Sequence, residues 1–230
     1  MLKDQHSVIE RKKQILNILR LSKANTVREN TMLNMIKGCK ISHPERLKSQ
    51  YELATDNITA NVDADKIDEI LQHFISMKDE PLFFILELPS NAADEDEIRP
   101  GVVENLHKDV YYIDGCDKEK VLTILKGEAD ILINDGLCCF GFGGHESGDE
   151  IMSNQYNIMT IYSKNIEKYS GFFEQHNITK TKRLTTAWDT FTKDSPGECE
   201  LYEKEEKNVY SILEDFKDLG IYLAERKEDL

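Results

Sequence analysis

The chain has 230 residues, of which 40% are apolar and 31% are charged, and this is the composition of a globular protein. It contains no run of about 18 apolar residues, so the sequence predicts no transmembrane helix. Its charged first residues lack the apolar core and the cleavage site of a signal peptide. We therefore expect a cytoplasmic protein with no membrane partner.

The formal net charge of -14 is unevenly distributed along the sequence. Residues 1–50 contain 11 Lys+Arg and 4 Asp+Glu, a balance of +7, whereas residues 51–230 contain 18 and 39, a balance of -21. The acidic body is expected to repel nucleic acid and to attract basic proteins, through long-range fields that salt weakens. The basic segment either contacts nucleic acid or docks on the acidic body, and docking is the simpler interpretation.

The five cysteines favour reduced thiols over disulfides. Their number is odd, no C-x-x-C occurs, and Cys138 and Cys139 are adjacent in a predicted strand. Neighbouring side chains of a strand point to opposite faces, so these two are not expected to pair with each other. Buried reduced thiols are typical of a cytoplasmic protein.

The first 60 residues are predicted to be mainly helical. Apolar residues at helical spacing predict a helix over 7–21. Two capping-box patterns follow, Thr26-Val27-Arg28-Glu29 and Ser42-His43-Pro44-Glu45, and the second opens a predicted helix through about Leu53. Two capped helices joined by a short turn could form a helix-turn-helix, although an ordinary helical hairpin is the commoner arrangement. Residues 55–62 are polar and are predicted to be a linker.

Strand and helix signals alternate through the rest of the chain. Asp135-Gly136 lies between apolar β-forming runs, so 130–134 and 137–142 are predicted as the central hairpin. The order of elements predicts an α+β fold, with a mixed, mainly antiparallel sheet and packed helices, preceded by an N-terminal helical region. We expect a basic helical region at 1–60 and an acidic α+β domain at 61–230. The other predicted strands are 82–88, 109–113, 157–163, 183–191 and 221–225, and the predicted helices are 63–77, 118–126, 165–175 and 207–219.

A long loop at 90–107 contains the acidic quartet Asp94, Glu95, Asp96 and Glu97. A loop of this length without predicted secondary structure is either functional or mobile. Such a quartet is most often simply solvated, and the alternative is a surface that binds a basic protein. These four carboxylates are the predicted partner-binding residues.

The densest polar cluster comprises His145, Glu146, Asp149 and Glu150. Three carboxylates and one imidazole could hold a divalent cation. Their spacing matches no known metal loop, and polar clusters beside glycines are usually solvated turns. The sequence therefore predicts no metal and no cofactor.

No catalytic residue is predicted. The glycines at 141, 143 and 144 do not match a phosphate-binding loop, and neither G-x-S-x-G nor H-E-x-x-H occurs. Cys138 or Cys139 with His145 as its base could act as a nucleophile, but a strand thiol among apolar neighbours is more often inert core. An enzyme that uses residues 138–150 is the least favoured interpretation.

Several stretches resemble a group of uncharacterised bacterial cytoplasmic proteins that look like immunity proteins of polymorphic toxin systems. They are Phe83–Pro89, Val110–Gly115, Ile131–Gly136, Phe140–Gly143, Tyr156–Tyr162 and Ala187–Phe191. The resemblance covers residues 80–226 and consists of strands and turns, so no functional residue is carried over from it. It implies a non-enzymatic binding protein that neutralises a toxin.

The acidic body fits that interpretation. A nuclease toxin is commonly basic, and an acidic protein can mimic the phosphate backbone, associate quickly and block the active site. The alternative is a transcriptional or other regulator, in which residues 1–54 bind nucleic acid and the α+β body senses a ligand or partner.

Overall fold

The structure of the protein, a computed structural model, describes residues 32–90, 97–99, 102–103 and 107–228. The chain divides into two units, Met1–Met32 and Leu33–Leu230, and all of the described secondary structure belongs to the second. The helix predicted at 7–21 and the capping box at Thr26 lie outside the described residues.

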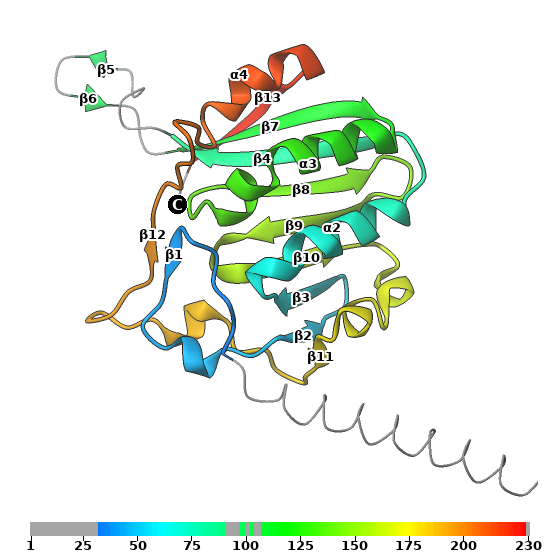
Figure 1. The fold of residues 1–230 in the computed structure, drawn as a ribbon, viewed down its shortest axis with the longest axis vertical. Coiled ribbons are helices and arrows are strands. Elements are labelled where there is room, and N and C mark those ends of the chain that lie inside the picture. The colour runs from blue at the N-terminus through cyan, green and yellow to red at the C-terminus, as the bar shows by residue number, and fades with distance from the viewer. Residues whose placement is uncertain (1–31, 91–96, 100–101, 104–106, 229–230) are drawn as a thin grey trace, which may run out of the picture. The chain divides into compact units, whose positions relative to one another are not determined.

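A nine-stranded sheet forms the centre of the second unit (Figure 1). Its strands in chain order are β2 (Gln50–Leu53), β3 (Asn57–Asn61), β4 (Leu82–Pro89), β7 (His107–Cys116), β8 (Cys139–Gly144), β9 (Asp149–Asn154), β10 (Ile158–Tyr162), β11 (Thr179–Lys180) and β13 (Tyr222–Glu228). Their spatial order is β11-β2-β3-β10-β9-β8-β4-β7-β13. Only β11 and β2 are parallel, and every other neighbouring pair is antiparallel.

Two short antiparallel pairs lie outside this sheet. One joins β1 (Cys39–Lys40) to β12 (Glu198–Cys199), and the other joins β5 (Glu97–Arg99) to β6 (Val102–Val103). The first pair connects the beginning of the second unit to a segment close to its end.

Three α-helices and several short 3-10 helices complete the described structure. The α-helices are α2 (Ile67–Ser76), α3 (Lys118–Asn134) and α4 (Ile212–Asp215). The 3-10 helices are η1 (Pro44–Arg46), η2 (Ala64–Lys66), η3 (Gln155–Asn157), η4 (Ile166–Tyr169), η5 (Phe173–His176), η6 (Ala187–Thr190) and η7 (Lys217–Leu219). Among the described helices, none has the length and apolar character needed to cross a membrane.

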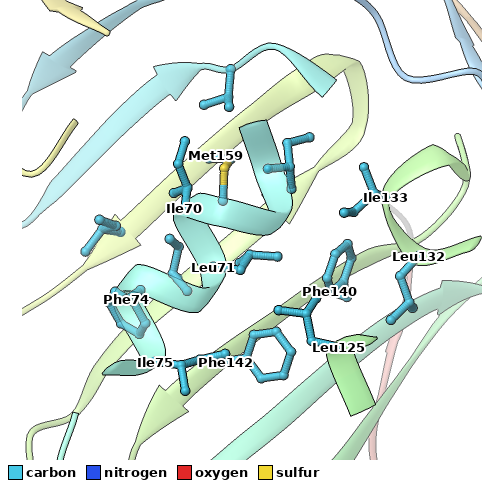
Figure 2. Packing of buried hydrophobic residues seen from close by; sticks show 14 of the residues in the cluster. Ile70, Leu71, Phe74, Ile75, Leu125, Leu132, Ile133, Phe140, Phe142 and Met159 are labelled. Atoms are coloured by element: carbon cyan, nitrogen blue, oxygen red, sulfur yellow. The ribbon is translucent and has the colours of Figure 1, made fainter. Parts of the chain in front are cut away.

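The main core lies between α2, α3 and one face of the sheet, which we call the covered face (Figure 2). The apolar side chains of α2 recur at helical spacing and are buried: Ile67, Ile70, Leu71, Phe74 and Ile75. Burial of each such side chain stabilises the fold by about 1.5–3 kcal/mol before the entropy cost is counted. They pack with Phe140 and Phe142 of β8 and with Met159 of β10.

The opposite face, which we call the open face, has no α-helix over it within the described residues (Figure 1). Successive side chains along each strand point to opposite faces of the sheet, so every strand contributes residues to both faces. In β4, Phe84 and Leu86 enter the main core, whereas Phe83 and Ile85 lie on the open face. The open face carries a second apolar cluster that consists of Phe83, Ile85, Val110, Tyr112, Cys139 and Met152.

Glycines in β8 allow large side chains to lie flat on the open face. A Cβ atom at Gly143 would lie 2.1 Å from the end of the Phe83 ring, and one at Gly141 would lie 2.5 Å from the Met152 sulfur. Both distances are too short for real contacts, so a side chain at either position would displace its neighbour. The two glycines therefore leave room on the open face for the side chains of Phe83 and Met152.

The predicted α+β class with a large mixed sheet is confirmed. The strands predicted at 82–88, 109–113, 157–163 and 221–225 correspond to β4, β7, β10 and β13, and the helix at 63–77 corresponds to η2 and α2. The domain boundary predicted at residue 60 falls inside the second unit, between elements of one core.

The predicted central hairpin at 130–134 and 137–142 is wrong. α3 continues through Gly127, where the predicted helix ended, and it buries Ile131, Leu132 and Ile133 against the sheet. The Asp135 carboxylate then accepts hydrogen bonds from the backbone N–H groups of 137 and 138, each at 2.8 Å, and turns the chain without a hairpin. The hairpin that does form joins β8 to β9, and β9 was not predicted.

Residues 42–62 also differ from the prediction. The helix expected after Ser42 is only the three-residue η1, with no side-chain cap at His43, and it leads into β2. Residues 55–62, predicted as a linker, contain β3, which pairs with β2 and β10. Burial of Tyr51, Ile58 and Ala60 in the core outweighs a local capping pattern.

The predictions for the C-terminal third are only partly right. The strand predicted at 183–191 is irregular and contains η6, whose first turn is held by a capping box between Thr186 and Asp189. The helices predicted at 165–175 and 207–219 are each divided into two short helices. The second short helix of each pair is followed by a residue in the left-handed conformation, Asn177 with φ of 58° and Gly220 with φ of 83°.

Two glycine substitutions should have opposite effects on stability. Gly143→Ala should lower the free energy of unfolding by about 1–3 kcal/mol, because the new methyl group displaces Phe83. Gly127→Ala should raise it by about 0.5–1 kcal/mol, since Gly127 lies inside α3 with open space beside it. Urea unfolding of both variants measures the difference, and equal effects would contradict this account of the open face.

Candidate functional site

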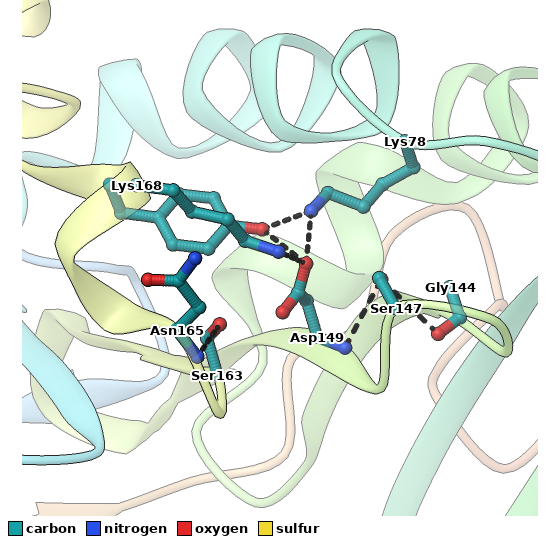
Figure 3. A network of polar contacts seen from close by, with 8 residues as sticks. Lys78, Gly144, Ser147, Asp149, Ser163, Asn165 and Lys168 are labelled. Atoms are coloured by element: carbon teal, nitrogen blue, oxygen red, sulfur yellow. Dashed lines mark hydrogen bonds and ion pairs between the residues drawn. The ribbon is translucent and has the colours of Figure 1, made fainter.

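A buried ionic network joins the chain just after α2, the start of β9, and η4 (Figure 3). The Asp149 Oδ2 atom accepts hydrogen bonds from Lys78 Nζ at 2.7 Å and from the Tyr169 hydroxyl at 2.9 Å, and it also pairs with Lys168. Lys78 and Asp149 are almost fully buried. The network therefore ties three segments to the covered face.

The ionisable side chains of this network shift each other's pKa. Burial alone would raise the pKa of Asp149, but hydrogen bonds from Lys168, Lys78 and Tyr169 hold it well below its usual range. Burial lowers the pKa of Lys78, and its bond to Asp149 opposes that shift. The carboxylate is thus held ionised through its Oδ2 atom, which is the behaviour of a structural ion pair, whereas its buried Oδ1 atom has no hydrogen-bond partner among the described residues.

Two histidines form a second polar chain. His73 Nδ1 lies 2.8 Å from His176 Nε2, and His176 Nδ1 lies 3.0 Å from Glu69 Oε1. Burial, followed by the neighbouring His176, lowers the pKa of His73. The chain links α2 to η5, and the His73 ring stacks on Phe172 with 4.7 Å between the centroids. We assign it a packing role.

The four residues weighed as metal ligands do not converge. His145 Nε2 lies 3.0 Å from an Asp114 oxygen, Glu146 is exposed, and Asp149 faces the covered side within the ionic network. Glu150 is the next residue along β9 and therefore faces the open side. Within the described residues, no group of three or more His, Cys, Asp or Glu side chains is placed to hold a metal ion.

Glu150 is the notable group on the open face. Its carboxylate is half-buried and, among the described residues, it has no hydrogen-bond or ion-pair partner. Burial raises its pKa, and the nearby Glu87 raises it further, against the opposing effect of Lys227. A half-buried carboxylate without a partner is costly for the fold, because burial removes water without supplying a counter-charge.

Aromatic side chains surround this carboxylate. In the register of the sheet, Glu150 lies between Tyr162 of β10 and Gly143 of β8, over which the Phe83 ring lies. Burial raises the pKa of Tyr162 and of Tyr112, and in both cases the Glu150 charge adds to the shift. We call Glu150 with Phe83, Tyr112 and Tyr162 the Glu150 site.

Glu87, a second glutamate of the open face, differs from Glu150 because it has ion-pair partners. Glu87 lies on the same face and is paired with Lys227 at 3.1 Å and with Lys108 at 3.7 Å. The two lysines belong to β13 and β7, at the other side of the open face from β9. The fold therefore forms ion pairs with one carboxylate of this face, whereas Lys227 acts on the other only by opposing its raised pKa from a distance.

The predicted partner-binding quartet is not placed by the structure. Asp94, Glu95 and Asp96 lie outside the described residues, and Glu97 is the first residue of β5, opposite Val103. Cys138 and Cys139 point to opposite faces, as predicted, and both are buried. Burial raises the pKa of both thiols, which leaves them poor nucleophiles.

Sequence reasoning missed the Glu150 site because it did not recognise β9. Residues 149–154 read Asp-Glu-Ile-Met-Ser-Asn and lack the apolar-polar alternation of a half-buried strand, so no clear signal in the sequence would place Glu150 beside β10. Compared with known proteins, the chain matches no family model, no curated protein and no solved structure.

Asp149→Asn should destabilise the protein by about 3 kcal/mol, because it leaves the buried Lys78 without its counter-charge. Glu146→Gln, in the preceding turn and exposed, is the matched control and should change stability by less than about 0.5 kcal/mol. Urea unfolding at neutral pH measures both.

The same ion pair predicts a loss of stability in acid. The pKa of Asp149 is lower in the folded protein than in the unfolded chain, so its stabilisation is complete above the unfolded pKa of about 4 and is lost as the pH falls further. Asp149→Asn should therefore flatten the dependence of unfolding free energy on pH below about pH 4. An unchanged slope in that variant would remove Asp149 as the cause.

Proposed function

We propose that this protein is a non-enzymatic binding protein that holds a basic protein partner on its open face, and that it acts as an immunity protein against a basic, nuclease-type toxin. The observation that carries the proposal is the unpaired, half-buried carboxylate of Glu150 among aromatic rings. We infer that a Lys or Arg side chain of the partner enters the Glu150 site.

The chemistry of the site favours a cation. A guanidinium or ammonium group would pair directly with Glu150, and the neighbouring aromatic rings of Tyr112, Tyr162 and Phe83 are of the kind that attracts the same cation. Aromatic side chains that are partly exposed and rigidly held are typical anchors of protein interfaces. Tyr162 is 46% exposed, and it is therefore accessible to a partner.

The charge of the body supports a basic protein rather than a small cation. Residues 51–230 carry 18 Lys+Arg against 39 Asp+Glu, a balance of -21 that steers a positively charged protein toward the chain from a distance. The open face extends across β10, β9, β8, β4 and β7, and glycines in β8 leave room for Phe83 and Met152 beside that strand. A partly aromatic surface of several strands that contains an acidic group suits a folded partner.

The alternative is a regulator that binds nucleic acid through residues 1–54. One argument for it, the predicted helix-turn-helix, is not supported by the structure. The second helix of the supposed helix-turn-helix, expected through Leu53, is replaced by η1 and β2. Residues 39–61 belong to the strands and core of the acidic unit. The binding protein is the reading that the geometry favours.

Glu150→Gln should weaken the complex with the basic partner by about 2 kcal/mol, or roughly 30-fold in Kd, because it removes a partly buried charge pair. The tagged protein is first used to capture its partner from its own cytoplasm at low salt, and Kd is then measured by calorimetry with the purified partner. Glu146→Gln is the matched control, with the same charge change four residues away at an exposed position, and should change Kd by no more than about 2-fold.

Equal Kd values for Glu150→Gln and the parent protein would refute the Glu150 site as the contact. Recovery of nucleic acid in place of a basic protein would refute the proposed function as a whole and would favour the regulator.

The affinity should also depend on pH through Glu150. Because burial and Glu87 raise the pKa of Glu150, this carboxylate is protonated at a higher pH than an ordinary glutamate, and its protonated form cannot pair with a cation. The Kd should therefore increase as the pH is lowered toward that pKa. In Glu150→Gln this increase should be absent, and a pH dependence that survives the substitution would assign it to another group.

A further inference from the structure

Two cysteines that are distant in the sequence face each other across a short strand pair. Cys39 of β1 and Cys199 of β12 are direct register partners, 160 residues apart in the chain, and their sulfur atoms lie 3.7 Å apart. The Glu200 N–H donates to the Gly38 carbonyl at 2.8 Å, so this is a non-hydrogen-bonded pair, the kind in which Cα atoms approach most closely. Both thiols are reduced.

The approach of the two strands is fixed by the surrounding backbone. Gly38 N–H also donates to the Asn134 carbonyl at 2.8 Å, and Gly136 N–H donates to the Glu200 carbonyl at 3.1 Å. A Cβ at Gly136 would lie 2.0 Å from the Gly38 oxygen, so only glycine allows this contact. The backbone just after α3 therefore holds β1 against β12 and fixes the approach of the two strands that carry the cysteines.

The two thiols differ in protonation and exposure. A hydrogen bond from Cys39 lowers the pKa of Cys199 to about 7, against the opposing effect of burial. The same contact raises the pKa of Cys39, whose sulfur also accepts the Tyr156 N–H at 3.4 Å. Cys199 is partly exposed, whereas Cys39 is buried. Cys199 is thus the more accessible of the two thiols and the one that ionises more readily.

We propose that Cys39 and Cys199 form a peroxide-reactive dithiol site, in which Cys199 is oxidised by a hydroperoxide and Cys39 resolves it to an intramolecular disulfide. The proposal rests on the register pairing, the 3.7 Å separation of the sulfurs and the partial exposure of Cys199. Closure to a disulfide needs the two sulfurs to approach by about 1.6 Å, and a non-hydrogen-bonded register pair has a Cα separation of about 4.5 Å, which lies within the range that a disulfide spans.

The chemistry balances in two steps. The Cys199 thiolate attacks one oxygen of hydrogen peroxide, the O–O bond breaks, and Cys199 becomes a sulfenic acid as hydroxide leaves. The Cys39 sulfur then attacks the Cys199 sulfur, and the hydroxyl group leaves with the Cys39 proton as water. The two sulfurs lose two electrons in total and the peroxide gains them. A dithiol reductant reverses the bond by exchange.

The disulfide would join the start of the second unit to a segment near its end. Reduced, β1 and β12 are held by two residue pairs of backbone bonding and by the glycine contact with the end of α3. Oxidised, the chain is closed into a loop of about 160 residues, which restricts the unfolded state strongly. The oxidised protein should therefore be the more stable form.

The test treats the folded full-length protein with hydrogen peroxide, alkylates the remaining thiols after denaturation, and maps the peptides by mass spectrometry. We expect a peptide cross-link between Cys39 and Cys199, reversed by dithiothreitol, while the buried Cys116, Cys138 and Cys139 remain alkylated. In Cys39→Ser, dimedone should trap Cys199 as a sulfenic acid. The Tm of the oxidised parent should increase by on the order of 10 °C, with no increase in Cys199→Ser.

Three outcomes would overturn the proposal. In the first, both cysteines remain fully alkylated after peroxide. In the second, Cys199 proceeds to a sulfinic acid while Cys39 stays alkylated. In the third, the disulfide joins a different pair or two separate chains. The peptide map of the parent protein distinguishes these outcomes even if the serine variants fold poorly.

Discussion

One constraint shapes the described fold: its α-helices cover only one face of a large, nearly antiparallel sheet. Every central strand must therefore supply two kinds of side chain in alternation, apolar ones for the core under α2 and α3, and a second set for the face without helices. In β4 this gives Phe84 and Leu86 on one side and Phe83, Ile85 and Glu87 on the other. The function that we propose depends on the side chains of the face without helices, because those of the other face are buried in the core.

The two carboxylates of β9 show how sharply the alternation separates roles. Asp149 turns toward the covered face, where Lys78, Lys168 and Tyr169 all bind its Oδ2 atom. Its neighbour Glu150 turns to the open face, where it forms no hydrogen bond or ion pair within the described residues and only the more distant Lys227 opposes its raised pKa. Adjacent acidic residues thus serve stability in one case and are free to serve recognition in the other.

The sequence predicted the elements whose pattern is local. β4 is an apolar run closed by a proline, and α2 has five buried residues at helical spacing, so both were recognisable without a structure. α3 was shortened because Gly127 resembles a stop and Asp135-Gly136 resembles a hairpin turn, yet burial of Ile131, Leu132 and Ile133 keeps the chain helical. The candidate site could not be predicted from the sequence, because it depends on the register of β8, β9 and β10. The contact between Cys39 and Cys199 spans 160 residues, and no spacing rule predicts it.

The position of β13 has a consequence for how the protein avoids self-association. It is the last strand of the main sheet at one edge and, within the described part of the chain, it pairs only with β7, so its outer backbone groups present a template for another strand. Four consecutive charged residues, Glu225 to Glu228, occupy this edge, and a register shift interrupts it between Leu223 and Glu225. Charges and bulges of this kind discourage edge-to-edge pairing and the growth of intermolecular sheets. The C-terminal strand therefore closes the sheet and also protects the protein against aggregation.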